Sequence, residues 1–137
     1  MANKQFTAPQ FSECIEDFLS MARAAISDYE WNGQQISLLD KETQDYLHSL
    51  ELDGLTYNER AKVATKLANC RRLRRISKNT VEILSPLVDF LISPTGKSVI
   101  NNMQEILGRT RKVEKLQEKR TYRCKVINKE DKSNGYK

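Results

Sequence analysis

Apolar residues recur along this chain at alternating steps of four and three, a spacing that places them on one face of an α-helix. The clearest run lies near the N-terminus and consists of Phe11, Ile15, Phe18, Ala22, Ala25 and Tyr29. Leu19 and Ile26 widen this stripe, and acidic residues stand near its start, where the helix dipole favours anions. Strand-like alternation extends nowhere beyond a few residues. The pattern predicts an all-α protein.

Turn signals divide the first half of the chain into two predicted helices. Asn32-Gly33 is expected to end the first helix, because both residues favour turns. The second helix would then begin with Ser37 as a cap and stop at Gly54, a residue typical of helix ends. Its apolar positions are Leu39, Tyr46 and Leu50.

The third predicted helix has the clearest start signal in the sequence. Thr56 and Glu59 fit a capping box, in which each side chain bonds the other residue's backbone N–H. Nothing interrupts the pattern from there to Leu84, a length of about 40 Å at 1.5 Å per residue. Pro86 is expected to kink or restart the helix, with Ser85 as its cap.

A fourth helix is predicted from about Thr95 to Lys119, after a second Ser-Pro pair. Its apolar positions at helical spacing are Val99, Met103, Ile106 and Val113. Short connections favour antiparallel neighbours, so we expect a helical hairpin or bundle of about four helices with a long, kinked third helix. Residues 9–120 would form one domain, between a flexible N-terminus (1–8) and a short extended segment with a flexible tail (121–137).

An apolar seam runs along the third predicted helix, interrupted by two polar residues. Its apolar members are Val63, Leu67, Cys70, Val81, Leu84, Val88 and Leu91. Arg74 and Ser77 occupy the two remaining positions of the same spacing, and such polar residues often fix register or oligomeric state. A charge in a seam needs a carboxylate or water beside it. We therefore expect self-association, most simply as a dimer.

Charge is divided unevenly between the two halves of the chain. Residues 1–56 carry three basic and ten acidic side chains, a net charge of −7, whereas residues 57–137 carry 20 basic and eight acidic ones, a net charge of +12. Two interpretations follow. The halves lie on each other and partly neutralise, or the basic half meets nucleic acid or another anion.

The strongest candidate for binding is a cluster of basic residues on the third helix. It consists of Arg60, Arg71, Arg74, Arg75 and Lys78, which share about a third of the helix circumference. Arginine suits phosphate because its planar fork donates two parallel hydrogen bonds. No aromatic residue interleaves the cluster, which favours a duplex backbone or a small nucleotide over stacked single strands. There are two alternatives to phosphate binding by this cluster. It is a solvated face that the acidic half neutralises, or it binds an acidic protein surface.

A second basic run lies at the end of the fourth predicted helix and beyond it. It includes Arg109, Arg111, Lys112, Lys115, Arg120, Tyr122 and Arg123. Basic residues are favoured at a helix C-terminus by the dipole alone. Tyr122 is the one member able to stack on a base.

No pattern in the sequence indicates catalysis. Thr95-Gly96-Lys97-Ser98 resembles the end of a P-loop, but Leu91 stands where the motif needs glycine, and no strand precedes it. His48 between Asp45 and Glu51 has side chains that can bind a metal or relay a proton in an enzyme, but the three residues are interpreted as an ion-paired surface. In a further alternative, the two acids orient arginines of the third helix. No nucleophile stands beside a base. We expect a protein that is not an enzyme and has no cofactor and no metal.

The cysteines and hydropathy indicate a cytoplasmic protein. Cys14, Cys70 and Cys124 have no metal or disulfide spacing, and free thiols suit a reducing compartment. No apolar run approaches the length of a membrane span, and the N-terminus lacks the apolar core of a signal peptide.

The stretch from Tyr46 to Leu91 resembles small, uncharacterised helical accessory proteins of bacteriophages and prophages. The likeness is carried by Leu47-His48-x-Leu50-Glu51-Leu52 followed by Arg71-Arg72-x-Arg74-Arg75. It covers about a third of the chain and implies an inhibitor or sequestering binder that acts on host machinery. It transfers no functional residues.

These observations together predict a non-catalytic binding protein. Its arginine-rich helix would bind a phosphate-bearing ligand, either nucleic acid or a small nucleotide. The alternative is a protein–protein interaction module or inhibitor that applies the same helix to an acidic partner.

Overall fold

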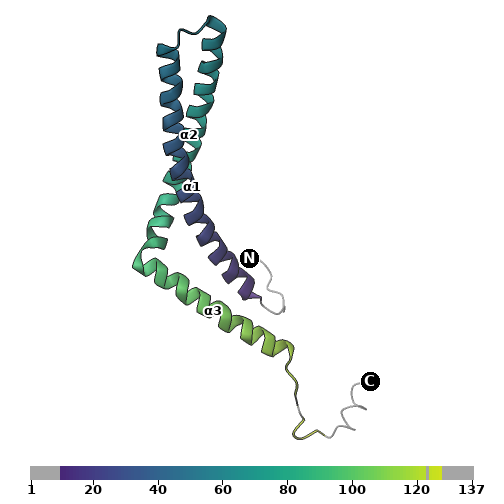
Figure 1. Cartoon of the computed structure of the whole chain (residues 1–137). Coiled ribbons are helices and arrows are strands. Elements are labelled where there is room, and N and C mark those ends of the chain that lie inside the picture. The colour runs from purple at the N-terminus through teal and green to yellow at the C-terminus, as the bar shows by residue number, and fades with distance from the viewer. Residues whose placement is uncertain (1–9, 123, 128–137) are drawn as a thin grey trace, which may run out of the picture.

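The computed structural model describes residues 10–122 and 124–127 and contains three helices in that part of the chain (Figure 1). They are α1 (Phe11–Leu52), α2 (Tyr57–Ile92) and α3 (Pro94–Glu118). No strand occurs among the described residues, and residues 121, 122 and 124–127 form neither helix nor strand. The all-α prediction is confirmed, and the predicted count of four helices is wrong. The expected flexible ends, residues 1–8 and 128–137, lie outside the described residues.

The first two predicted helices are one helix, because α1 continues without a break through Asn32-Gly33. The four-and-three spacing carries on across this point, through Asn32, Ile36, Leu39, Thr43, Tyr46 and Leu50. Asn32 is buried, and its side-chain amide donates to the carbonyl of Asp28 at 2.8 Å. Gly33 costs a helix about 1 kcal/mol, which packing along α2 outweighs. Ser37 therefore lies inside the helix and caps nothing.

The turn between α1 and α2 forms as the sequence predicts. Gly54 adopts a φ of +56°, the left-handed conformation in which glycine ends a helix without strain. Thr56 Oγ1 accepts from the N–H of Glu59 at 3.3 Å, and Glu59 Oε2 accepts from the N–H of Thr56 at 3.4 Å. The capping box is confirmed.

The second Ser-Pro pair, rather than the first, marks the end of a helix. α2 continues through Pro86 to Ile92, so the predicted restart at Ser85-Pro86 is wrong, and a kink there is not confirmed. The chain turns by 75° between α2 and α3. At this bend Ser93 Oγ accepts from the N–H of Gly96 at 3.1 Å, and Pro94 occupies the first turn of α3.

α1 and α2 form an antiparallel hairpin. The residues of α1 at four-and-three spacing, which we call the seam of α1, face the seam of α2. Thr43 Oγ1 lies 3.5 Å from Cys70 Sγ, which fixes the register between them. That register places each seam residue of α1 against one of α2. The deepest part of the core lies near the α3 end of the hairpin and contains Ala22, Ala25, Val88 and Leu91.

α3 turns back along the first half of α1, and the two helices run antiparallel. Ser12 Oγ donates to Glu114 at 2.7 Å, and Arg111 donates to Glu16 at 2.7 Å. Met103 of the predicted α3 stripe is partly buried, but Ile106 and Val113 are 42% and 52% exposed, so that stripe is wrong in part. The positions of α3 less exposed to solvent are Gly96, Val99, Ile100, Met103, Leu107, Thr110 and Glu114.

Among the described helices, none alone has a stretch long and apolar enough to cross a membrane. α2 and α3 meet that criterion only when they are joined across their 75° bend.

Candidate anion-binding surface

The hairpin has two long sides, which are set by the residues next to the seams. In an antiparallel pair, the residues that directly follow seam positions point to the same side in both helices. On α2 these residues include Arg71, Arg75 and Lys78, and on α1 they include Asp40. We call these four residues the basic side. Further along the same side lie the acidic residues Glu30, Glu51, Glu82 and Asp89. α3 packs on the same side of the hairpin, nearer the N-terminus of α1, through Ile26 and Ile100.

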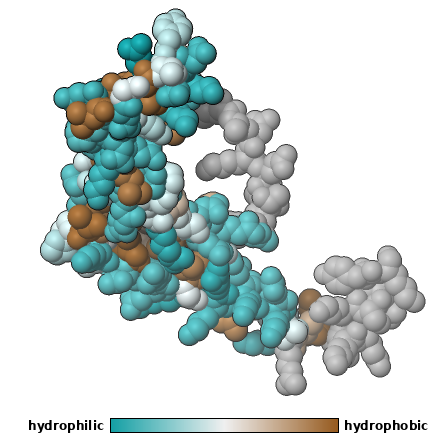
Figure 2. Space-filling view, turned by 45° about the horizontal axis from the view of Figure 1, so that its top comes forward, coloured by the Kyte–Doolittle hydropathy of each residue, from teal (hydrophilic) through white to brown (hydrophobic). Residues whose placement is uncertain are grey.

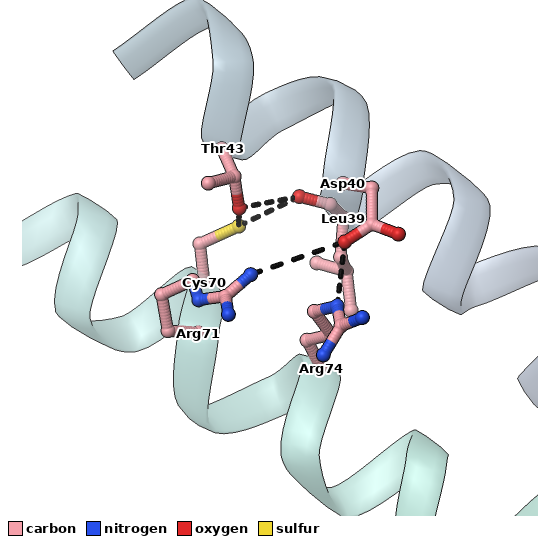
Figure 3. Close-up of polar contacts among 6 residues, drawn as sticks. All are labelled: Leu39, Asp40, Thr43, Cys70, Arg71 and Arg74. Atoms are coloured by element: carbon pink, nitrogen blue, oxygen red, sulfur yellow. Dashed lines mark hydrogen bonds and ion pairs between the residues drawn. The ribbon is translucent and has the colours of Figure 1, made fainter. Parts of the chain in front are cut away.

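Arg74 stands in the seam itself and is held by Asp40 of α1. Its Nε donates to Asp40 Oδ1 at 2.5 Å, and the arginine side chain is only 20% exposed (Figure 3). Arg71 reaches the same carboxylate oxygen at 3.9 Å. The expectation that the seam arginine needs a carboxylate is confirmed, but the same chain supplies it. This charge therefore gives no reason for self-association.

The carboxylate that orients the arginines is Asp40, and the hypothesis that Asp45 and Glu51 do so is wrong. Both of those residues are exposed, and neither forms an ion pair within the described residues. The antiparallel register explains why Asp40 pairs with the arginines, because it places Asp40 beside Arg74 and places Asp45 and Glu51 nearer the hairpin turn.

A buried polar group lies one helix turn from this ion pair. Thr43 Oγ1 and Cys70 Sγ both donate to the carbonyl oxygen of Leu39, at 2.8 and 3.3 Å (Figure 3). No buried side-chain nitrogen or oxygen among the described residues lacks a partner. Satisfied polar groups in a seam favour one register over its alternatives, so this group holds Asp40 in place beside the arginines.

Arg75 and Lys78 complete the basic side and form no ion pair among the described residues. Arg75 is exposed, Lys78 is partly buried, and neither has an acidic partner within 4 Å in the described part of the chain. Arg60 is exposed near the start of α2, about 16 Å along the axis from Arg71. The predicted cluster is therefore divided into one seam residue, three residues on the basic side and one distant residue.

The second basic run is partly neutralised and lies on α3. Arg111 pairs with Glu16, whereas Lys112, Lys115 and Arg120 are exposed. Arg109 lines an open groove of about 290 Å³ between α3 and the start of α1, together with Phe11, Thr110, Val113, Glu114 and Gln117. Tyr122 is 75% exposed, and Arg123 lies outside the described residues.

No group of three or more His, Cys, Asp or Glu side chains able to hold a metal ion occurs among the described residues. In comparisons with protein-family models, curated proteins and solved structures, the chain matches none.

Sequence reasoning missed Asp40, although a signal for it existed. The α1 seam, extended through Asn32, places Asp40 directly after a seam position, and pairing with the α2 seam then brings it to Arg74. The predicted break at Asn32-Gly33 concealed this relation.

Proposed function

We propose that this protein is a non-catalytic binding protein that holds a phosphate-bearing polymer on its basic side. The observation that carries the proposal is that Arg75 and Lys78 form no ion pair among the described residues, beside two arginines that one carboxylate already orients. Arg71 remains 50% exposed and can still donate to a ligand. Exposed guanidinium groups that can still donate suit phosphate oxygens, which accept paired hydrogen bonds.

The arrangement favours an extended ligand over a small nucleotide. Residues 71–78 span about 10 Å of one helix, so their side chains follow a line along its surface. A row of charges on a helix suits a phosphate backbone, whose charges are also spaced along a line. We therefore favour duplex nucleic acid, bound through its backbone and without base recognition.

Salt-dependent binding tests this proposal. Fluorescence anisotropy would be measured with labelled duplex DNA, duplex RNA and a nucleoside triphosphate at about 50 and 200 mM salt, because neutralising phosphates makes affinity fall steeply with salt. We expect Arg75→Ala/Lys78→Ala to weaken duplex binding and to reduce the salt slope by about one for each phosphate that the variant no longer neutralises. Lys112→Ala/Lys115→Ala removes two charges from α3 and serves as the matched control.

Two results would overturn the proposal. One is a parent protein that binds no duplex at the lower salt concentration, and the other is a double variant with unchanged affinity and slope. If a carboxylate polymer binds where duplexes do not, and Arg75→Ala/Lys78→Ala abolishes that binding, the basic side instead serves an acidic protein partner.

A further inference from the structure

The side of the hairpin opposite the basic side is strongly apolar and uncovered within the described residues. Trp31, Leu38, Leu73, Ile76, Ile83 and Phe90 are each between 45% and 77% exposed. We call these six residues the apolar side. Hydrophobic patches among polar surface are visible along the hairpin in Figure 2.

These six residues form a second seam on the hairpin. Each directly precedes a position of the first seam, so in an antiparallel pair all six point to one side. Leu73, Ile76, Ile83 and Phe90 keep the four-and-three spacing on α2, with Thr80 at the position between Ile76 and Ile83. Repeated apolar positions of this kind are what one helix presents to another. The apolar side thus has the pattern of a surface that packs against helices.

The area of the apolar side is large for a monomer and adequate for a dimer. Large apolar side chains exposed to these fractions present on the order of 600 Å² in total, which is at the upper end of the largest apolar patches on monomers. Two such surfaces would bury about 1,200 Å², the lower bound of stable interfaces.

Charged residues on the same side indicate that a second copy of this chain covers the apolar side, and they set its orientation. Toward the hairpin turn, beside the apolar residues, α1 carries Glu42 and Asp45, whereas α2 carries Lys62 and Lys66. When two hairpins meet with their turns at the same end, α1 of each copy lies on α2 of the other, and opposite charges face each other. Hairpins that meet with their turns at opposite ends place α1 on α1, so that like charges face each other.

We propose that two copies of this chain join through their apolar sides into a four-helix bundle, with both hairpin turns at the same end. Each α1 packs on the partner's α2, so that Leu38 meets Leu73 and Ile76 of the partner subunit. The basic sides then face outward on opposite surfaces of the dimer. The dimer does not depend on the phosphate-binding proposal.

Light scattering on the full chain tests the existence of the dimer. At tens of micromolar we expect twice the 15.8 kDa mass of one chain. Ile76→Gln/Ile83→Gln should produce monomers with an unchanged helical circular-dichroism spectrum, because both side chains are mostly exposed in the single chain. Leu47→Gln alters a 44% exposed side chain on the other side of the hairpin and should leave the dimer intact. A monomeric parent, or a dimer unaffected by the double change, would overturn the proposal.

Charge reversal tests the orientation. Lys62→Glu/Lys66→Glu and Glu42→Lys/Asp45→Lys each place like charges opposite one another across the proposed interface, and each should weaken dimerisation about tenfold or more. A mixture of the two variants restores opposite charges at both contacts and should form a heterodimer. If either variant alone dimerises as tightly as the parent, the orientation with α1 on α2 is wrong.

Discussion

Asp40 and Arg74 show how a charge is accommodated inside a helix seam. The arginine side chain is 20% exposed and the aspartate 49%, so the pair is partly screened by water. Loss of the carboxylate leaves a largely buried guanidinium without its partner, which costs more than the pair itself contributes. The main effect of Asp40 is therefore to allow an arginine at position 74 of the seam.

Replacement of Asp40 by asparagine should lower the free energy of unfolding by about 1 kcal/mol, the scale of a partly exposed charged hydrogen bond. Urea denaturation measures the change. Glu30→Gln on the same helix alters an exposed acid that has no ion pair among the described residues and lies outside the proposed dimer interface, so it should be neutral. Equal effects of the two substitutions would show that Asp40 does not support Arg74.

Gly96 is the residue that the 75° bend between α2 and α3 requires. A Cβ atom built there would lie 2.8 Å from the Cα of Leu91 and closer still to the carbonyl oxygen of Phe90. Both obstacles are backbone atoms, so neither can rotate away. The glycine in the P-loop-like Thr95-Gly96-Lys97-Ser98 thus has a packing reason that requires no phosphate.

Gly96→Ala should destabilise the protein by about 2–3 kcal/mol, the upper part of the range for overpacking. Gly108→Ala, also within α3, meets no atom within 4 Å and should stabilise the protein by up to about 1 kcal/mol. Thermal unfolding followed by circular dichroism compares the two. A Gly96→Ala protein that melts with the parent would contradict the close approach at the bend.

At the level of helices, the seam spacing proves a stronger signal than individual turn residues. The capping box at Thr56 and the stop at Gly54 were predictable because backbone chemistry decides them locally. The break at Asn32-Gly33 was not real, because Asn32 satisfies its amide inside the helix and the seam continues in phase. The wrong part of the α3 stripe has another cause, since sequence spacing alone does not tell which of two apolar faces finds a partner.

A substitution at Gly33 tests directly whether α1 is continuous. Nothing lies within 4 Å of a Cβ atom at this position, and the residue is within a helix. Gly33→Ala should therefore raise the free energy of unfolding by about 0.5–1 kcal/mol, through better helix propensity and a less flexible unfolded chain. A destabilised Gly33→Ala protein would indicate that α1 is interrupted there.

At the scale of the whole molecule, the core is concentrated where all three helices meet. Ala22, Ala25, Val88 and Leu91 are each at most 6% exposed, whereas near the hairpin turn Leu50, Val63 and Leu67 are only partly buried. A single sequence predicts the seams but not this gradient, because α3 reinforces only one end of the hairpin. The basic side lies between the two regions, anchored by Asp40.

Truncation of one leucine at each end of the hairpin measures this gradient. Leu91→Ala removes a 2% exposed side chain packed among three helices and should cost about 3 kcal/mol or more, whereas Leu67→Ala, which is only partly buried, should cost nearer 1 kcal/mol. Hydrogen exchange should agree, with amides around Val88–Leu91 exchanging more slowly than those around residues 57–63. Equal costs at the two ends would mean that α3 adds little to the core. The bend at Ser93 would then serve only to connect two helices.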